Sequence, residues 1–192
     1  AKGDLGEMID TLLDDDRVTA IGLHIEGLDD IERFSKAALR ALDKGVPIVA
    51  IKTGRSEAGA ALTMSHTSSL AGSDALFDAL FKRYGIGRAK DVSVFIETLK
   101  LLHVHGPLSG NTVSSMSCSG GEAGLVADLA SDAGLPTPPL PKVAEAKLFE
   151  ALGPKVPLAN PLDYHTYIWG NLEASTATFS AMLGAGYAMN LL

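Results

Sequence analysis

The chain is poor in cysteine and has no long apolar run. Cys118 is its only cysteine, so a disulfide within the chain is excluded and a reducing, cytoplasmic setting is expected. No apolar stretch approaches the roughly 18 residues that a membrane span requires. No secretory signal opens the sequence. The first residue is Ala1 rather than Met, and both ends look cut, so we expect a fragment of a longer protein.

Basic residues are also scarce. Lys and Arg number 16 against 23 Asp and Glu, which gives a net charge of −7 and a pI near 5.1. Nucleic acids and anionic membranes both require a cationic face, so neither is expected as a partner. Hydrophobic residues still make up 46% of the 192 residues. That share supplies a core for one large or two small domains.

Helical and strand-like segments alternate along residues 1–107. Apolar residues at helical spacing, closed by glycines such as Gly45, alternate with short β-branched runs. Short connections between such elements favour a parallel sheet covered on both sides. We expect helices over 5–13, 29–42, 74–84 and 92–102, strands over 18–25, 47–51 and 86–89, and a loop, with or without a short helix, over 52–72.

Gly106-Pro107 interrupts this pattern, and the alternation of helical and strand-like segments resumes over residues 108–192. We place a domain boundary there. Prolines between 136 and 141 predict an extended segment, and Asn160-Pro161 predicts the start of a loop. Here we expect a strand over 112–118, a tight turn at 119–121, and helices over 122–133, 142–152 and 172–183. The two halves share this alternation of elements, but their sequences show no residue-level repeat.

His66 is the histidine best placed for chemistry. It lies among small residues, with Gly59 and Gly72 near the ends of its loop, so a bulky charged reactant can reach it. Glu26 follows an earlier strand, and ligands of open α/β sheets gather at the carboxyl ends of strands. A carboxylate on one ring nitrogen fixes the tautomer and frees the other nitrogen to attack. The alternative is that Glu26 is an ordinary, solvated turn carboxylate.

Two segments are candidates for phosphate binding. Ser119-Gly120-Gly121 precedes a predicted helix, whose first N–H groups attract anions. Alternatively, Ser119 is a simple helix cap. Lys52-Thr-Gly-Arg55-Ser56 ends a strand with two cations and a hydroxyl, but matches no nucleotide-binding fingerprint. A solvated basic turn explains that segment equally well.

Three further patterns carry weaker hypotheses. His103 and His105 form a His-x-His pair that would bind metal on a strand, but a third ligand is missing, so no metal site is predicted. Ser119 with Asp163 and His165 resembles a loosened hydrolase triad. Asp163 and His165 are too close in sequence to align readily as orienting acid and base. Cys118 fits a buried small residue, and the loop around His165 fits either a pocket lining or a packed edge.

Several of these motifs together resemble the phosphohistidine region of ADP-forming acyl-CoA synthetases, relatives of succinyl-CoA synthetase. The resemblance covers almost the whole chain. It is carried by Ile48–Ser56, Gly59, Ser65-His66-Thr67, Ser69–Asp74, Tyr84-Gly-Ile86, the Ser119–Gly121 turn with Asp128, and Asn160-Pro-Leu-Asp163. Ser68 departs from the glycine that related sequences commonly place after Ser-His-Thr.

The resemblance implies two flavodoxin-like, three-layer αβα domains with mainly parallel sheets, over 1–107 and 108–192, the second truncated. It implies that His66 carries a phosphoryl group between acyl phosphate and ADP while Glu26 orients it. Ser65, Thr67 and the Ser119–Gly121 turn are then expected to bind phosphate. No metal ligand is assigned.

The rest of such an enzyme is not visible in this chain. CoA and ATP or ADP with Mg²⁺ are expected to bind mainly to a CoA-binding domain and an ATP-grasp domain or subunit, in a homo- or hetero-oligomer that activates a small carboxylic acid. We therefore expect a fragment of an acid–CoA ligase that is inactive alone. The alternative is a non-catalytic, acyl-CoA-sensing or regulatory module of a fused protein acyltransferase.

Overall fold

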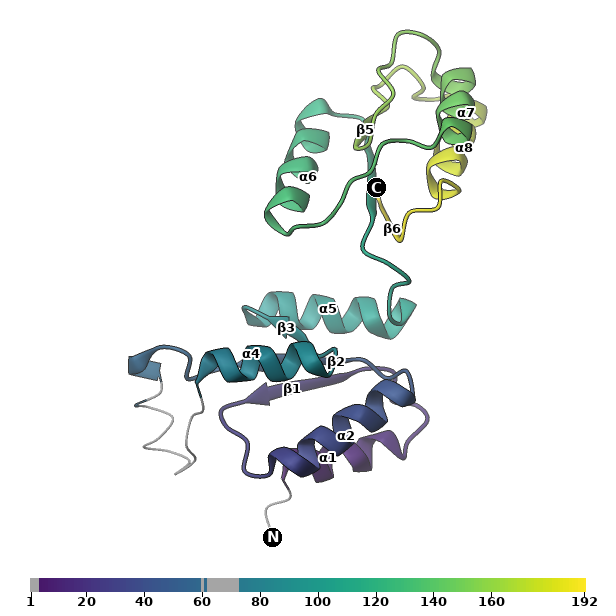
Figure 1. The fold of residues 1–192 in the computed structure, drawn as a ribbon. Coiled ribbons are helices and arrows are strands. Elements are labelled where there is room, and N and C mark those ends of the chain that lie inside the picture. Colours follow the sequence, from purple (N-terminus) through teal and green to yellow (C-terminus); the bar gives the residue numbers. More distant parts are fainter. Residues whose placement is uncertain (1–3, 60, 62–72) are drawn as a thin grey trace. The chain divides into compact units, whose positions relative to one another are not determined.

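The computed structural model describes residues 4–59, 61 and 73–192. Its backbone divides into two compact units, which we call unit 1 (residues 1–107) and unit 2 (residues 108–192) (Figure 1). Each unit contains a small sheet whose paired strands are all parallel. The expected α/β class with parallel sheets is therefore confirmed. In the part of the chain that the structure describes, no helix has the length and apolarity to cross a membrane.

The sheet of unit 1 has the order β1-β2-β3, with strands Ile21–Ile25, Ile48–Lys52 and Gly87–Ala89. Ile25 pairs with Lys52, and Ile51 pairs with Ala89. Because the strands are parallel, their carboxyl ends meet at one edge. The residues that follow Ile25, Lys52 and Ala89 are thus brought together there.

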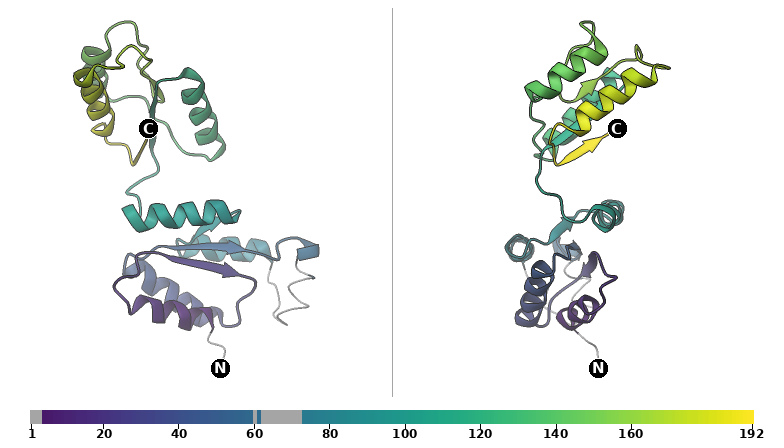
Figure 2. Two further views of the ribbon diagram at one scale, coloured as in Figure 1. Left: turned by 180° about the vertical axis from the view of Figure 1, so that it is seen from behind. Right: turned by 90° about the vertical axis from the view of Figure 1, so that its right-hand side faces the viewer.

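Unit 1 contains helices α1 (Leu5–Leu13), α2 (Ile31–Asp43), α4 (Asp74–Arg83) and α5 (Val92–His105), and the described residues 57–59 and 61 are also helical. Aspartate N-caps start three of them: Asp4, Asp30 and Asp91 accept hydrogen bonds from the N–H groups of Glu7, Arg33 and Val94. In the right-hand view of Figure 2, α2 and α4 lie on one side of the sheet and α5 on the other. Helices therefore cover both faces, as the alternating pattern predicts.

The core of unit 1 follows the alternation of side chains along β1. Ile21, Leu23 and Ile25 are buried in a cluster with apolar residues of α1, α2 and α4. A side chain at Gly22 would point the other way, since its Cβ would lie 2.7 Å from atoms of both Phe95 and Leu99 of α5. Burying each such aliphatic side chain stabilises the fold by roughly 1.5–3 kcal/mol.

Gly6 allows α1 and α2 to approach closely. A Cβ there would lie 2.8 Å from the carbonyl carbon of Arg33 and 2.9 Å from the amide nitrogen of Phe34, both backbone atoms that cannot swing aside. The absence of a side chain is therefore a packing requirement of this helix pair.

We predict that Gly6→Ala destabilises the protein by about 1–3 kcal/mol, because overpacking outweighs the gain in helix propensity. Urea denaturation followed by far-UV circular dichroism measures the change. Gly124→Ala in α6 (Gly120–Asp132) is the matched control, since a Cβ there meets no atom within 4 Å. Equal stability of Gly6→Ala and the unmodified chain would contradict the packing argument.

Unit 2 has its own sheet of order β5-β4-β6. Central strand β4 spans Val113–Ser117, β5 spans Leu162–Asp163 and β6 spans Met189–Leu191. Figures 1 and 2 show α6 on one side of these strands, and α7 (Lys142–Leu152) and α8 (Leu172–Leu183) together on the other. Segments 162–163 and 189–191, which the sequence does not predict as strands, pair with β4 on its two sides.

Asn160 ties the extended proline segment to the sheet of unit 2. Its side-chain amide donates to the carbonyls of Val113 and Pro138, both at 2.9 Å, and its Oδ1 accepts the N–H of Ser115 at 3.2 Å. Tyr187 adds hydrogen bonds from its hydroxyl to the carbonyls of Pro138 and Pro139. The segment thus follows the course that its prolines predict.

The metal hypothesis for His103 and His105 is wrong in its premise. Both residues lie in the last turn of α5 rather than on a strand. Side chains two residues apart on a helix point to different faces and cannot chelate one ion together. His103 Nδ1 instead lies 2.6 Å from the hydroxyl of Thr19. Across the described ranges, no group of three or more His, Cys, Asp or Glu side chains is arranged to hold a metal.

Candidate functional site at the carboxyl edges of the sheets

Three of the residues predicted to handle phosphate, Ser65, His66 and Thr67, lie outside the described residues. The remaining candidates fall at the carboxyl edges of the two sheets. Glu26 and the Lys52–Ser56 segment follow β1 and β2 of unit 1, whereas Ser119, Gly120 and Gly121 follow β4 of unit 2.

Glu26 is half-buried directly after β1. The Thr53 N–H donates to the carbonyl of Ile25 at 3.1 Å, so the pairing of β1 and β2 continues to this point. On the same stretch, His24 Nε2 lies 3.1 Å from the Thr53 hydroxyl. Glu26 is therefore fixed at the sheet edge, next to the end of β2.

Lys52 is buried at the end of β2, with only 3% of its surface exposed. Its Nζ donates to the Thr53 carbonyl and lies 4.7 Å from the ring centroid of Phe77 in α4. Burial lowers the pKa of the Lys52 ammonium, and the charges of Asp74 and Glu26 partly offset that effect. A solvated basic turn, one of the two readings of this segment, is therefore wrong for Lys52.

Arg88 and the acids of α4 form the rest of this edge. Arg88 in β3 donates to Asp74 at 2.5 Å and to Asp78 at 3.4 Å, which joins the sheet to α4. Its positive charge adds to the depression of the Lys52 pKa. The edge thus places two cations, Lys52 and Arg88, close to Glu26 and Asp74.

The stability of unit 1 should rise at alkaline pH because of Lys52. Its pKa is lower in the folded chain than the ordinary 10.5, so the folded state binds fewer protons between the two values. Stability increases with pH wherever the unfolded state binds more protons. We predict that Lys52→Met abolishes a rise in unfolding free energy below about pH 10.5.

Urea denaturation across that pH interval measures the effect. Lys36→Met is the matched control, because Lys36 is exposed and pairs with Glu32 at 2.7 Å. The control should keep the alkaline rise. A rise of the same size in Lys52→Met would show that another group causes it.

In unit 2, Ser119 occupies the N-cap of α6, and Gly120 and Gly121 are its first two residues. The Ser119 hydroxyl makes no capping hydrogen bond. The first N–H groups of a helix lack partners within it, so they form a donor cluster at this edge. Asp163 of β5 also lies here, since a Cβ on Gly120 would be 3.2 Å from its Oδ2. The helix terminus therefore already faces one carboxylate.

The Asp163 carboxylate lies next to both the backbone and the ring of His165. Asp163 Oδ1 accepts the His165 N–H at 2.9 Å, and Oδ2 lies 3.7 Å from His165 Nδ1. The two side chains are therefore close, but at 3.7 Å the Asp163 carboxylate does not hydrogen-bond the His165 ring as an orienting acid would. The triad itself is not formed in the described residues, where no hydrogen bond joins the Ser119 hydroxyl to the His165 ring.

Cys118 is half-buried, rather than buried, beside Tyr164. Burial, and then the neighbouring Cys118 and Glu122, raise the pKa of the Tyr164 hydroxyl. Tyr164 belongs to the loop predicted as a pocket lining or a packed edge, and its ring packs against Phe179 beside the core of unit 2.

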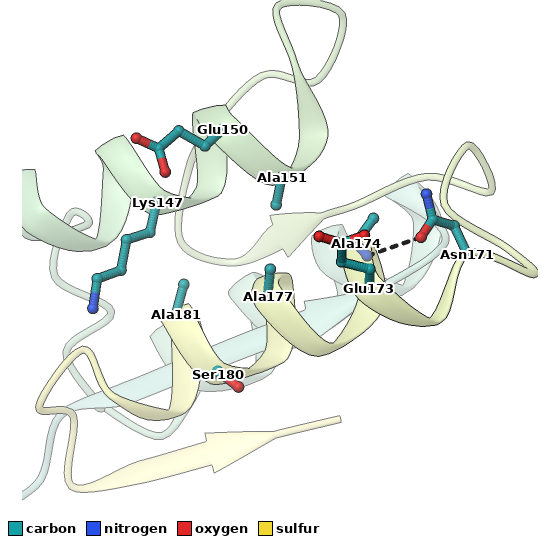
Figure 3. Close-up of a pocket in the computed structure, with 9 residues that line it drawn as sticks. All are labelled: Lys147, Glu150, Ala151, Asn171, Glu173, Ala174, Ala177, Ser180 and Ala181. Atoms are coloured by element: carbon teal, nitrogen blue, oxygen red, sulfur yellow. Dashed lines mark hydrogen bonds between the residues drawn. The ribbon is translucent and has the colours of Figure 1, made fainter.

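A separate hollow of about 540 Å³ lies between α7 and α8 (Figure 3). Alanines line its middle, and Lys147, Glu150 and Glu173 stand around it. Two carboxylates against one ammonium repel an anionic ligand, so this hollow does not suit phosphate chemistry. None of the described residues that the sequence predicts for the site lines this hollow.

The chain is similar to a known protein family and to several characterised proteins. Residues 1–102 match the family model described as a succinyl-CoA ligase like flavodoxin domain. The ADP-forming acetate–CoA ligase of Methanocaldococcus jannaschii is 36% identical over 164 residues, covering 84% of this chain and 23% of the relative. Subunit alpha of the ADP-forming acetate–CoA ligase II of Pyrococcus furiosus is 33% identical over 160 residues, covering 83% of this chain and 35% of that subunit.

Among solved structures, the dinucleotide forming acetyl-coenzyme A synthetase 1 of Ca. Korarchaeum cryptofilum, in complex with phosphate and ADP, superposes with a TM-score of 0.78. It is 24% identical, and the match covers 98% of this chain and 48% of that chain. This likeness supports the fold. The chain spans only a quarter to a third of the two curated relatives.

Proposed function

Because the family model covers more than half of the chain, the chain belongs to the succinyl-CoA ligase-like flavodoxin family, and we propose that it is part of an NDP-forming acyl-CoA synthetase. The observation that carries the proposal is 36% identity to an ADP-forming acetate–CoA ligase over 84% of the chain. Residues of this chain would relay a phosphoryl group between acyl phosphate and ADP.

In this proposal a ring nitrogen of His66 attacks the phosphorus of the acyl phosphate. An N–P bond forms, the bond from phosphorus to the acyl oxygen breaks, and the carboxylate leaves. ADP then takes the phosphoryl group and the imidazole is restored. Glu26 would accept a hydrogen bond from the other ring nitrogen and stabilise the cationic, phosphorylated ring. The half-buried position of Glu26 at the sheet edge supports this role.

The Ser119–Gly121 terminus of α6 would bind a phosphoryl group through its N–H donors. Ser65 and Thr67, in the chain segment of His66, would bind phosphate through their hydroxyls. Glycines at the first two helical positions leave the backbone approachable. The Asp163 carboxylate next to Gly120 would restrain how much negative charge this terminus accepts.

We further propose that units 1 and 2 are two succinyl-CoA-ligase-like flavodoxin domains. CoA and the nucleotide, the latter with Mg²⁺, would bind mainly to a CoA-binding domain and an ATP-grasp domain or subunit. A small carboxylic acid would be the substrate. Activity would require those partners.

The test is phosphorylation of the full-length protein with γ-labelled ATP and Mg²⁺. We predict an acid-labile label on His66 that is lost in His66→Ala. Glu26→Gln should slow labelling at least about tenfold, because the orienting carboxylate is lost. Glu32→Gln, at an exposed glutamate of α2, is the control and should label normally. An acid-stable label, or a label retained by His66→Ala, would refute the relay.

A further inference from the structure

Three cations of unit 1 line one hollow at the end of β2. The hollow has a volume of about 490 Å³, and Lys52, Arg55 and Lys90 line it together with Thr53 and Ser56. Among the described residues that line it, none is Asp or Glu. A concave site that carries charge of one sign concentrates ions of the opposite sign, which matters in a chain with net charge −7.

These three cations also lack the carboxylate partners that most lysines and arginines of unit 1 have. Arg33, Arg40 and Arg88, for example, each pair with two acids. Within the described ranges, Lys52, Arg55 and Lys90 form no ion pair within 4 Å. Asp74 and Glu26 act on Lys52 only from a greater distance, so no carboxylate of the described residues occupies the donors of these three cations.

Lys52 is the lining residue of the hollow whose side chain is held in place. Its side chain is almost fully buried, and its Nζ is held by the Thr53 carbonyl and the Phe77 ring. An ammonium has three donors, so it retains capacity for an anion. An anion bound there would offset the cost of burying the charge, which is visible as the lowered Lys52 pKa.

The turn after β2 supplies backbone and hydroxyl groups. Gly54 has φ +72°, a conformation that favours glycine. The Ser56 hydroxyl accepts the Gly59 N–H at 3.1 Å and so fixes the turn. Arg55 and Lys90 are exposed, which leaves their charged ends free to close on a ligand from two different loops.

We propose that this hollow binds the phosphate group of a small molecule, held by Lys52, Arg55 and Lys90. Three positive charges suit a phosphate dianion better than a single carboxylate, and Arg and Lys are its usual partners. The volume also admits a larger molecule that carries the phosphate. Lys52, Arg55 and Lys90 are not among the residues assigned to the relay, so the proposal goes beyond it.

The test is an NMR titration of the chain with sodium phosphate, and separately with ADP, at about pH 8, where a phosphate monoester is mostly dianionic. Ionic strength is held constant with sodium chloride. Saturable shifts of the amides of Thr53–Ser56 and Lys90 are expected. Tighter binding of ADP would identify a nucleotide as the source of the phosphate, and equal or weaker binding would identify the free ion.

Arg55→Gln and Lys90→Gln should each weaken binding about tenfold, because each removes a charged donor. Lys100→Gln is the control, since Lys100 is exposed in α5 and pairs with Glu97 at 2.9 Å. Both lining residues are exposed, so the variants should fold, which their amide spectra verify. Absence of saturable shifts with either ligand, or unchanged binding in both variants, would overturn the site. If the unmodified protein carries no label on His66 but still binds phosphate in the titration, the relay is refuted and the phosphate site is not.

Discussion

The burial of the Lys52 ammonium is the constraint on which the carboxyl edge of unit 1 depends. A charge taken out of water must be compensated or its pKa falls. Here compensation comes from the Thr53 carbonyl and the Phe77 ring, and from the charges of Asp74 and Glu26. These groups belong to the end of β2, to α4 and to the end of β1. One lysine thereby organises the place where we expect phosphate chemistry.

Parallel strands determine where the remaining chemistry collects. In each unit the strands run in one direction, so their following loops gather at one edge. That edge holds Glu26 and the cationic hollow in unit 1. In unit 2 it holds the start of α6 together with Asp163 and His165. In the described residues, the second edge sets Asp163 beside the start of α6, whereas three cations line the hollow at the first edge.

Much of the fold could be predicted because local signals were strong. Aspartates such as Asp30 and glycines such as Gly45 mark helix ends, and the apolar stripe of α2 is regular. The short strands β5 and β6 escaped prediction, since two or three residues show no alternation and pair only through β4. Helix α5 extends to His105, three residues beyond the predicted end, because its backbone hydrogen bonds continue past the last residues of the apolar pattern.

The site was less predictable than the fold. The sequence identified Lys52 and Arg55 as a basic segment, but the burial of Lys52 depends on Phe77, which lies 25 positions further along the chain. Lys90 joins the same hollow only because β3 pairs with β2. Similarly, the Asp163–His165 contact requires His165 at φ +56°, which spacing does not reveal.

The most direct test of this account is an NMR pH titration of the Lys52 side chain through its Cε resonance. The account predicts a titration midpoint below that of the exposed Lys36, and an upward shift of this midpoint in saturating phosphate. A Lys52 that titrates together with Lys36, with and without phosphate, would contradict it.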